Sequence, residues 1–333
     1  MARNMIDDSL VDEVKERNKQ IEKIKSEFHK VIIGHDDALS DVLKSCLCGG
    51  HVLIEGVPGI AKTLMVVVLS KLVSGSLYKR IQFTPDLLPS DITGTSVYEK
   101  QKGFYLVKGP IFANIIAGDE INRAPPKVQS AMLEAMAERN VTIGKETMPL
   151  PDPFMVLATQ NPLETRDVYP LPEAQLDRFL MKVVMEYTTK AEEAMIVDSN
   201  LEVKSLSDYK LEPVFSVKDI QEINNCIKKI YIAPEIKKYI VALVTATRNP
   251  KRYGIEEARY MQWGASPRAS IYLALSARAT ALMEGRVYTM PEDVRAVAKP
   301  VLRHRIILNY EGKARQIKHD EIIDAIIKKV PVM

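Results

Sequence analysis

A short loop rich in glycine and proline carries the clearest chemical pattern in the sequence. It reads Gly56-Val57-Pro58-Gly59-Ile60-Ala61-Lys62-Thr63 and matches the phosphate-binding pattern GxxxxGK[ST], except that Ala61 replaces the second glycine. Backbone N–H groups of such a loop surround phosphates, and the positive end of the following helix points toward them. We therefore predict that the nucleotide is contacted by the loop and the first helical turn, namely Val57, Pro58, Gly59, Ile60, Ala61, Lys62, Thr63 and Leu64.

Two side chains at the end of this loop have specific predicted roles. Lys62 is expected to reach the β- and γ-phosphates of ATP, and the Thr63 hydroxyl is expected to bind Mg²⁺. The methyl group of Ala61 is a small departure from the pattern, and it fits if φ stays negative at this residue. The alternative to a phosphate loop is a plain Gly-Pro turn.

Further along the chain, a predicted strand ends in two adjacent carboxylates. The run Ile115-Ile116-Ala117-Gly118 is followed by Asp119 and Glu120, and Asp119 lies 57 residues after Lys62. Asp119 is predicted to hold Mg²⁺, usually through water, and Glu120 to orient and deprotonate the attacking water. Paired carboxylates at the mouth of a buried strand are costly to desolvate, which favours a functional role. The alternative is a strand end exposed on the surface.

A polar turn follows the next apolar strand. It reads Thr159-Gln160-Asn161-Pro162. The Asn161 amide is predicted to hydrogen-bond both the attacking water and the γ-phosphate. The alternative is a cap of a helix or turn, because Asn-Pro commonly begins a turn.

The elements expected around these residues alternate between strand and helix. Charged residues with apolar side chains at helical spacing predict an N-terminal helix over 8–30. Such alternation predicts a parallel sheet with helices on both faces. We expect strands at 51–55, 80–83, 112–118, 154–159 and 179–185, and helices at 64–73 and 127–139.

From about residue 189 the pattern changes, with no convincing strand and dominant helical periodicity. Helices are predicted at 220–230, 236–247, 269–283 and 291–302. The domain prediction is therefore an α/β nucleotide-binding core over 1–188, including the helix 8–30, and a smaller all-helical lid over 189–333.

The amino-acid composition indicates the class of protein and its cellular compartment. Hydrophobic residues make up 46% and charged residues 27% of the chain, as in ordinary globular proteins, and the net charge of +3 is too small to indicate nucleic acid or membrane binding. The three cysteines have no framework spacing, which fits a reducing compartment. The longest apolar run, 64–69, is far shorter than a membrane span, and the first residues contain no apolar signal core. We expect a cytoplasmic protein without membrane insertion.

Long stretches of the sequence resemble the MoxR branch of the AAA+ superfamily, which is related to the magnesium-chelatase ATPase subunits. The similarity runs from about Val31 to His304. The longest matching stretch covers 119–136 and reads DEINRAPPKVQSAMLEAM. The stretches 169–179 (YPLPEAQLDRF) and 264–269 (GASPRA) resemble the arginine-finger and sensor 2 segments of the family. Alanine at the second Walker A glycine is also a family trait, so Ala61 supports the resemblance.

The resemblance implies an α/β core with a helical lid, in hexameric rings that bind ATP between neighbouring subunits. It implies that Asn161 is sensor 1, that Arg178 is the arginine finger given to the next subunit's γ-phosphate, and that Arg268 is sensor 2. Ile33 and Gly34, within 31–34, are expected near adenine. The stretch 96–109 is expected to be an insert with a β-hairpin, and 141–150 a second hairpin.

Physical arguments accompany the two arginine assignments. Arg178 would neutralise charge that builds on the transferred phosphoryl group; the alternative is a surface ion pair with Asp177 or Glu173. Arg268 follows Ser266-Pro267, a helix start that would aim dipole and guanidinium at phosphates; the alternative is an ordinary first-turn arginine. A contact of Arg123 with the neighbouring nucleotide is a further hypothesis.

The family implies Mg²⁺-dependent ATP hydrolysis coupled to chaperone-like assembly or activation of partner complexes, together with a separate protein that carries a von Willebrand factor A domain. No residue here identifies the client or indicates metal insertion. An alternative is a nucleic-acid motor or restriction component, because lysines at 100, 102 and 108 flank Phe104 and Tyr105. A solvated hairpin is the favoured interpretation, so nucleic acid is not an expected partner. A nucleotide-gated scaffold with little turnover is a third possibility.

Overall fold

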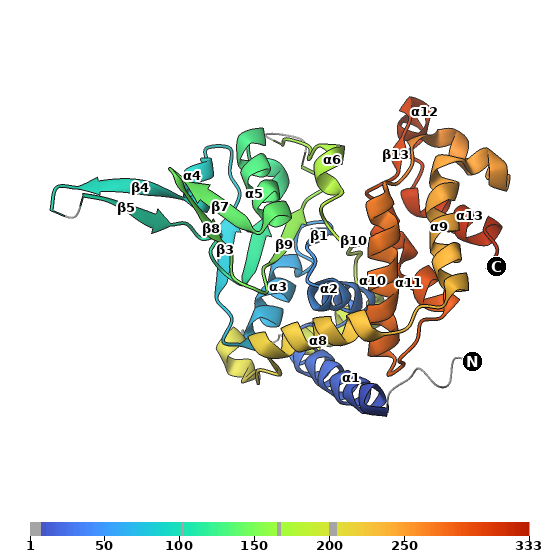
Figure 1. Ribbon diagram of the computed structural model, residues 1–333, viewed down its shortest axis with the longest axis horizontal. Helices are drawn as coiled ribbons and strands as arrows, with labels where there is room; N and C mark the ends of the chain where they lie inside the picture. The colour runs from blue at the N-terminus through green and yellow to red at the C-terminus, as the bar shows by residue number, and fades with distance from the viewer. Residues whose placement is uncertain (1–7, 102, 165–167, 200–204, 333) are drawn as a thin grey trace.

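The computed structural model describes residues 8–101, 103–164, 168–199 and 205–332. It consists of an α/β body, a helical lid beside it and a long β-hairpin that projects from the opposite side of the body (Figure 1). The long N-terminal helix α1 (Asp8–Phe28) lies across the base of the molecule.

The body is built on a five-stranded parallel sheet with the strand order β10-β1-β9-β6-β3. Its strands read as nearly continuous apolar runs because helices cover both faces. Met155 and Leu157 face the helices α1, α2 and α3, whereas Val156 and Ala158 face α4 and α5. The elements of the sheet and its covering helices are α2 (Asp36–Leu47), β1 (Val52–Glu55), α3 (Lys62–Lys71), β3 (Tyr78–Gln82), α4 (Pro89–Thr93), β6 (Ile115–Asp119), α5 (Pro126–Glu138), β9 (Met155–Gln160) and β10 (Met181–Val184).

All five predicted strands are present, with small changes in their bounds. The strand expected at 112–118 begins only at Ile115, because Phe112 and Ala113 form hydrogen-bonded turns and Asn114 ties the chain to Leu77 and Pro153. The sheet places β1, β9 and β6 side by side. The phosphate loop after β1, Asp119 at the end of β6 and Asn161 after β9 therefore meet at one edge.

Both predicted hairpins are present, and both lie outside the main sheet. The projecting one joins β4 (Gly94–Glu99) to β5 (Gly103–Lys108), and the shorter one joins β7 (Asn140–Ile143) to β8 (Glu146–Pro149). Position 94 requires glycine, because φ is +99° there and a Cβ would lie 2.1 Å from the Val107 carbonyl oxygen.

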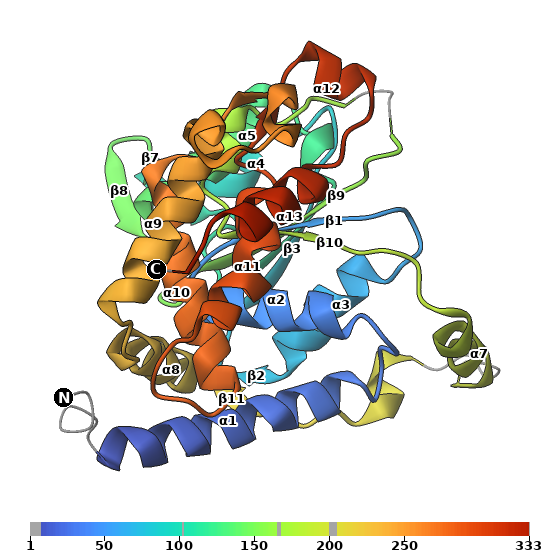
Figure 2. The same ribbon diagram turned by 90° about the vertical axis from the view of Figure 1, so that its right-hand side faces the viewer.

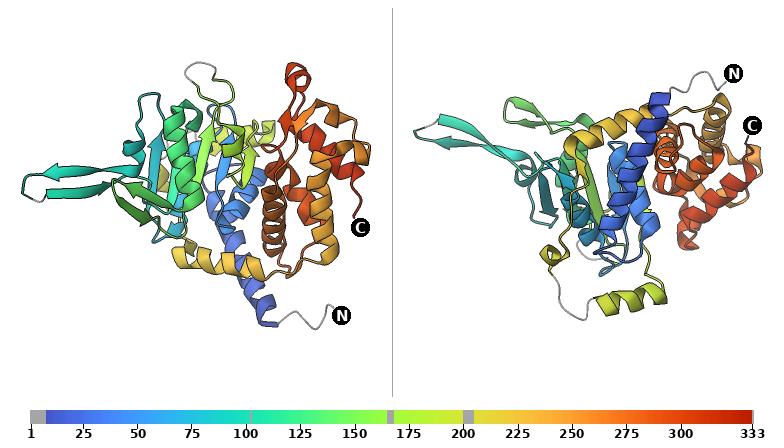
Figure 3. Two further views of the ribbon diagram at one scale, coloured as in Figure 1. Left: turned by 45° about the horizontal axis from the view of Figure 1, so that its top comes forward. Right: turned by 90° about the horizontal axis from the view of Figure 1, so that it is seen from below.

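Beyond the sheet the chain is mainly helical. Helix α8 packs against α1 and α2, and α10 packs against α9 and α11. The termini of the described chain lie on the lid side (Figure 3). These elements are α6 (Glu173–Leu176), α7 (Lys190–Ser199), α8 (Val217–Lys229), α9 (Pro234–Arg248), α10 (Pro267–Met283), α11 (Pro291–Leu302), α12 (Tyr310–Ala314) and α13 (His319–Lys329).

The expectation of no strand after residue 189 is wrong in detail. β11 (Phe215–Ser216) pairs in parallel with β2 (Val73–Ser74) of the body, and β12 (Met261–Trp263) pairs with β13 (Ile307–Leu308). These strands are two or three residues long, so they cannot show the alternation by which a strand is recognised in a sequence. Tertiary contacts between distant segments create them.

Candidate nucleotide-binding site

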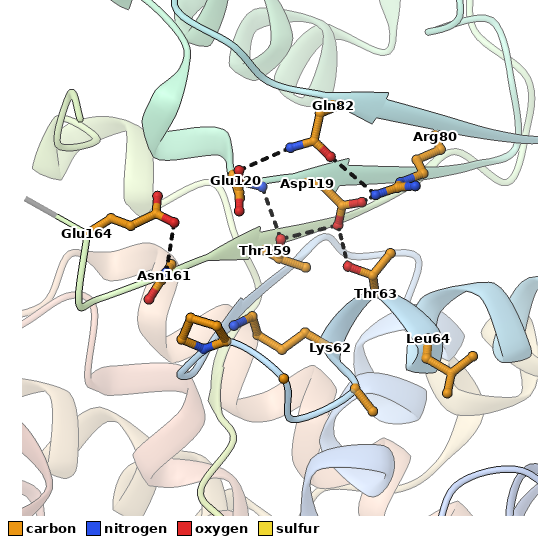
Figure 4. Close-up of a pocket in the computed structure, with 13 residues that line it drawn as sticks. Lys62, Thr63, Leu64, Arg80, Gln82, Asp119, Glu120, Thr159, Asn161 and Glu164 are labelled. Carbon is orange, nitrogen blue, oxygen red and sulfur yellow. Dashed lines mark hydrogen bonds and ion pairs between the residues drawn. The ribbon is translucent and has the colours of Figure 1, made fainter. Parts of the chain in front are cut away.

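A cavity of about 520 Å³ opens at the carboxyl edge of the sheet, where the predicted motifs converge. Its walls come from the phosphate loop and α3, from the ends of β3 and β6, and from the turn after β9 (Figure 4). Lys62, Thr63, Asp119, Glu120 and Asn161 all line it. Five residues predicted from three separate motifs therefore share one cavity.

The phosphate loop differs from the prediction at Ala61. This residue has φ +64° and ψ 23°, so the expectation that its φ stays negative is wrong. The loop must reverse before α3, and the Ala61 carbonyl already accepts the first helical hydrogen bond from Met65 at 2.9 Å. A left-handed non-glycine residue costs about 1–2 kcal/mol. Ala61 carries this cost with the smallest possible side chain. Gly59 also has positive φ, +86°, but pays no such cost because it has no Cβ.

Lys62 lies folded against the loop that it terminates. Its ammonium donates hydrogen bonds to the Gly56 carbonyl and, at 2.7 Å, to the Val57 carbonyl. Burial lowers the pKa of Lys62, while the carboxylates of Glu120, Glu164 and Asp119 oppose that shift. The ammonium is therefore held beside the cavity by two backbone carbonyls, with several carboxylates close enough to favour its charged form.

Asp119 is buried at 3% exposure, which contradicts the alternative of a surface-exposed strand end. Its Oδ1 accepts hydrogen bonds from the hydroxyls of Thr63 at 2.8 Å and Thr159 at 3.3 Å, and its Oδ2 pairs with Arg80 Nε at 2.6 Å. The Thr63 hydroxyl and the Asp119 carboxylate are hard oxygen donors that converge on one point, so this pair fits a Mg²⁺ ion.

Glu120 is the next residue, and its backbone turns sharply away from the strand. It has φ +57°, and its N–H donates to the Thr159 hydroxyl at 3.0 Å. The side-chain amide of Gln82 and the guanidinium of Arg123 each donate to its Oε2 at 3.1 Å. Strain in a left-handed residue is typical of positions that aim a functional side chain. Arg123 thus contacts Glu120 of its own chain.

Asn161 faces another carboxylate in the same cavity. Its Nδ2 donates to Glu164 Oε1 at 2.9 Å, and its Oδ1 accepts the Leu163 N–H at 3.1 Å. The side chain therefore caps the local turn, as the alternative interpretation expected, and also lines the cavity. The second oxygen of Glu164 is buried without a hydrogen-bond partner in the described structure.

A second cavity of about 380 Å³ adjoins the phosphate loop and is lined mostly by apolar side chains, which suits a purine base. It shares Pro58 and Leu64 with the first cavity and includes Ile33. Gly34 does not line this cavity itself; it lies between the lining residues Ile33 and His35, and a Cβ there would lie 2.6 Å from Glu192 Oε1. The predicted adenine segment thus lies beside the predicted phosphate loop.

Arg178 and Arg268 do not line either cavity of their own chain. Arg178 is half-buried after α6, its Nε has no hydrogen-bond partner, and no described carboxylate forms an ion pair with it, contrary to the surface-pair alternative. Arg268 pairs with Asp177 at 3.4 Å, and the Ser266 hydroxyl donates to the same carboxylate at 2.9 Å. Asp177, the neighbour of Arg178 in the sequence, thus links the first turn of α10 to the segment that carries Arg178.

The chain matches known proteins over nearly its whole length. Residues 51–181 match the model of the ATPase family associated with various cellular activities (AAA), and 255–326 match the AAA lid domain. It is 42% identical to Chaperone MoxR1 of Mycobacterium tuberculosis over 93% of this chain and 81% of that protein. It is 30% identical to Protein MoxR of Paracoccus denitrificans, over 91% and 93% of the two chains.

The chain belongs to the MoxR family of AAA+ ATPases. The crystal structure of a candidate ATPase from Cytophaga hutchinsonii superposes on this chain with a TM-score of 0.89 and is 45% identical in sequence. The superposition covers 98% of each chain. The predicted family and the predicted fold class, a P-loop parallel sheet with a helical lid, are confirmed, although the lid predicted as all-helical also contains the short strands β12 and β13. Every described helix is too short or too polar to span a bilayer.

Sequence reasoning missed several residues that line the cavity of this MoxR protein. Arg80 and Gln82 lie two apart on β3 and point toward Asp119 and Glu120 (Figure 4). Their alternation on a predicted strand was a usable signal, but only the strand order places β3 next to β6. Thr159 and Glu164 line the cavity as well. The polar turn after β9 includes Thr159 but predicts no role for it, and no motif includes Glu164.

The projecting hairpin of this MoxR protein exposes aromatic residues. Phe104 is 78% exposed and packs against Tyr98 at a tilt of 55°, with a centroid distance of 5.0 Å. Lys108 lies over the Phe112 ring at 5.0 Å, so one of the lysines considered for nucleic acid binding packs against the hairpin base. The lysine at 102 lies outside the described residues.

Proposed function

We propose that this chain hydrolyses ATP with Mg²⁺ at sites shared between neighbouring copies in a ring, most simply a hexamer. Within one copy, the N–H groups of the loop 56–63 and the Lys62 ammonium bind the phosphates. The Thr63 hydroxyl and the Asp119 carboxylate hold Mg²⁺, which when bound neutralises charge on the phosphate oxygens.

Glu120 and Asn161 act on the attacking water. Asn161 Nδ2 is positioned to orient the water and the γ-phosphate, and the Glu120 carboxylate accepts the proton of the water as it attacks. Gln82 and Arg123 fix the direction of Glu120 through its Oε2. Its second oxygen can then serve as the base without reorganisation of the backbone.

The position of Arg178 carries the proposal of a shared site. A cation is needed to neutralise the charge that develops on the transferred phosphoryl group. Arg178 does not line the cavity of its own chain, and no described carboxylate pairs with it. We assign Arg178 to the cavity of the next copy. Arg268, linked to the same edge through Asp177, is assigned to that cavity as well.

Mixing two inactive variants tests the shared site. Arg178→Ala retains Glu120, and Glu120→Gln retains Arg178, so each supplies the half that the other lacks. In a head-to-tail ring mixed randomly at equal amounts, about one quarter of the interfaces contain both functional halves, whatever the ring size. We expect recovery of about one quarter of the wild-type rate. Recovery of nothing in verified mixed rings would contradict a finger supplied in trans, and a third sample with the double variant is the control.

The cellular role proposed for the ring is chaperone-like remodelling that assembles or activates a partner complex, together with a separate protein carrying a von Willebrand factor A domain. The support is the family, one member of which is named a chaperone. A pull-down with the ATP-loaded Glu120→Gln variant, analysed by mass spectrometry, tests this role. Enrichment of such a partner over the Lys62→Ala control would support it. Enrichment of nuclease subunits or nucleic acid would replace it with the motor function.

A further inference from the structure

The turn after β9 holds the side chain of Asn161 by both ends of its amide. The Asn161 Oδ1 accepts the Leu163 N–H at 3.1 Å, and its Nδ2 donates to Glu164 Oε1 at 2.9 Å (Figure 4). A backbone N–H can only donate, and an ionised carboxylate can only accept. A flipped amide would place its nitrogen against the Leu163 N–H and its oxygen against the Glu164 carboxylate. The two contacts therefore fix the direction in which Nδ2 points.

This turn lies beside the phosphate loop. β9 pairs in parallel with β1, with Gln160 opposite Glu55, so both strands end at the same edge of the sheet. Figure 2 shows the two strands side by side, with the loop that joins β1 to α3 at that edge. Asn161 is 5% exposed, and both Asn161 and Glu164 line the cavity that the loop borders. An amide fixed in this turn is therefore also fixed relative to phosphates bound by the loop.

The position of Glu164 is unfavourable for a residue that serves the fold alone. Its Oε2 is buried and has no hydrogen-bond partner among the described residues, and the carboxylates of Asp119 and Glu120 line the same cavity. A buried carboxylate oxygen without a donor costs free energy, and like charges nearby add to that cost. Burial lowers the pKa of Lys62, and the Glu164 carboxylate is among the groups that raise it. A phosphate bound by Lys62 would therefore be repelled by the charge of Glu164.

We propose that Glu164 is a positioning residue for ATP hydrolysis, which holds the Asn161 amide so that an N–H of Nδ2 faces the attacking water and the γ-phosphate. This inference rests on the proposed function, in which Asn161 acts on that water. The side-chain nitrogen carries two N–H groups, so one can bond to Glu164 while the other is left for the cavity. Without Glu164 the nitrogen loses its partner and the amide can rotate. A donor fixed in advance stabilises a transition state better than one that must reorient.

Separate measurements of turnover and of ATP binding test this role. Glu164→Ala should lower kcat about tenfold, with the Glu120→Gln rate subtracted, because the amide no longer points at the water in every molecule. ATP affinity, measured by calorimetry in the Glu120→Gln background, should be unchanged or tighter because a carboxylate near the phosphates is lost. Glu164→Gln keeps an oxygen that can accept the Asn161 N–H, so it should retain more of kcat than Glu164→Ala. Glu146→Ala removes an exposed carboxylate on β8, outside the cavity, and is the matched control.

A double-mutant cycle tests whether Glu164 acts through Asn161. In an Asn161→Ala chain, Glu164→Ala should cause no further loss of rate in single turnovers, because the group that it positions is gone. A further loss of about tenfold in that background would overturn the positioning role, since Glu164 would then act on the water or the phosphate directly. An unchanged kcat in Glu164→Ala, or a loss of ATP affinity in parallel with kcat, would overturn it as well. A parent chain that hydrolyses ATP no faster than Glu120→Gln would instead overturn the proposed function.

Discussion

The ion pair between Arg80 and Asp119 predicts that one substitution will weaken the fold and strengthen Mg²⁺ binding. The Asp119 side chain is 4% exposed and that of Arg80 is 55% exposed, with 2.6 Å between Arg80 Nε and Asp119 Oδ2. In Arg80→Ala, the buried carboxylate keeps only the hydroxyl donors Thr63 and Thr159. Because Arg80 is half in solvent, we estimate the lost stabilisation at about 1 kcal/mol, between the values for surface and buried pairs.

Arg80 and Mg²⁺ compete for the Asp119 carboxylate. Removing Arg80 should therefore favour Mg²⁺ binding by the same free energy that the ion pair contributes to folding. A difference of about 1 kcal/mol corresponds to about fivefold, so the dissociation constant for Mg²⁺ in the presence of ADP should fall about fivefold. The melting temperature of the nucleotide-free chain should fall by about 2 °C. Calorimetric titration and thermal unfolding measure the two effects. Lys79→Ala, an exposed neighbour on β3, is the control. An unchanged melting temperature together with unchanged or weaker Mg²⁺ affinity would refute Arg80 as the competing cation.

Two further predictions concern the phosphate loop and a buried histidine. Lys62→Ala should abolish ATP binding in calorimetry because the loop loses its phosphate-neutralising cation, and tight binding by this variant would contradict the assigned site. Burial lowers the pKa of His51 to about 4, where its Nδ1 accepts the Val156 N–H and its Nε2 bonds to the Met136 carbonyl. Since the unfolded chain binds this proton more tightly, stability should be lost as pH falls from about 6.5 toward 4, by about 2–3 kcal/mol. Urea unfolding at pH 7.5 and pH 4.5 should show a smaller loss for His51→Gln, and an identical loss would exclude His51 as the titrating group.

Local sequence determined the chemical groups of the site and the elements that carry them. The sequence alone locates the loop 56–63, the carboxylates at the end of β6 and the amide after β9, because each lies at the end of an apolar strand. Short apolar runs bounded by turns are a local signal, and the residues that do chemistry lie at the ends of those runs. The N-terminal helix was predicted from apolar residues at helical spacing, whereas both hairpins were predicted only from the resemblance to the family.

Only the tertiary structure decided which side chains meet. Arg80 and Gln82 join the site because β3 pairs with β6, and strand order depends on contacts far apart in the sequence. The backbone at Ala61 adopts positive φ because the loop must reverse onto α3, which overrides the local preference of alanine. Asp177 joins Ser266 and Arg268 across 89 and 91 residues, and so sets the edge on which Arg178 and the lid meet. Long-range pairings of this kind follow from packing the whole chain, so no local pattern encodes them.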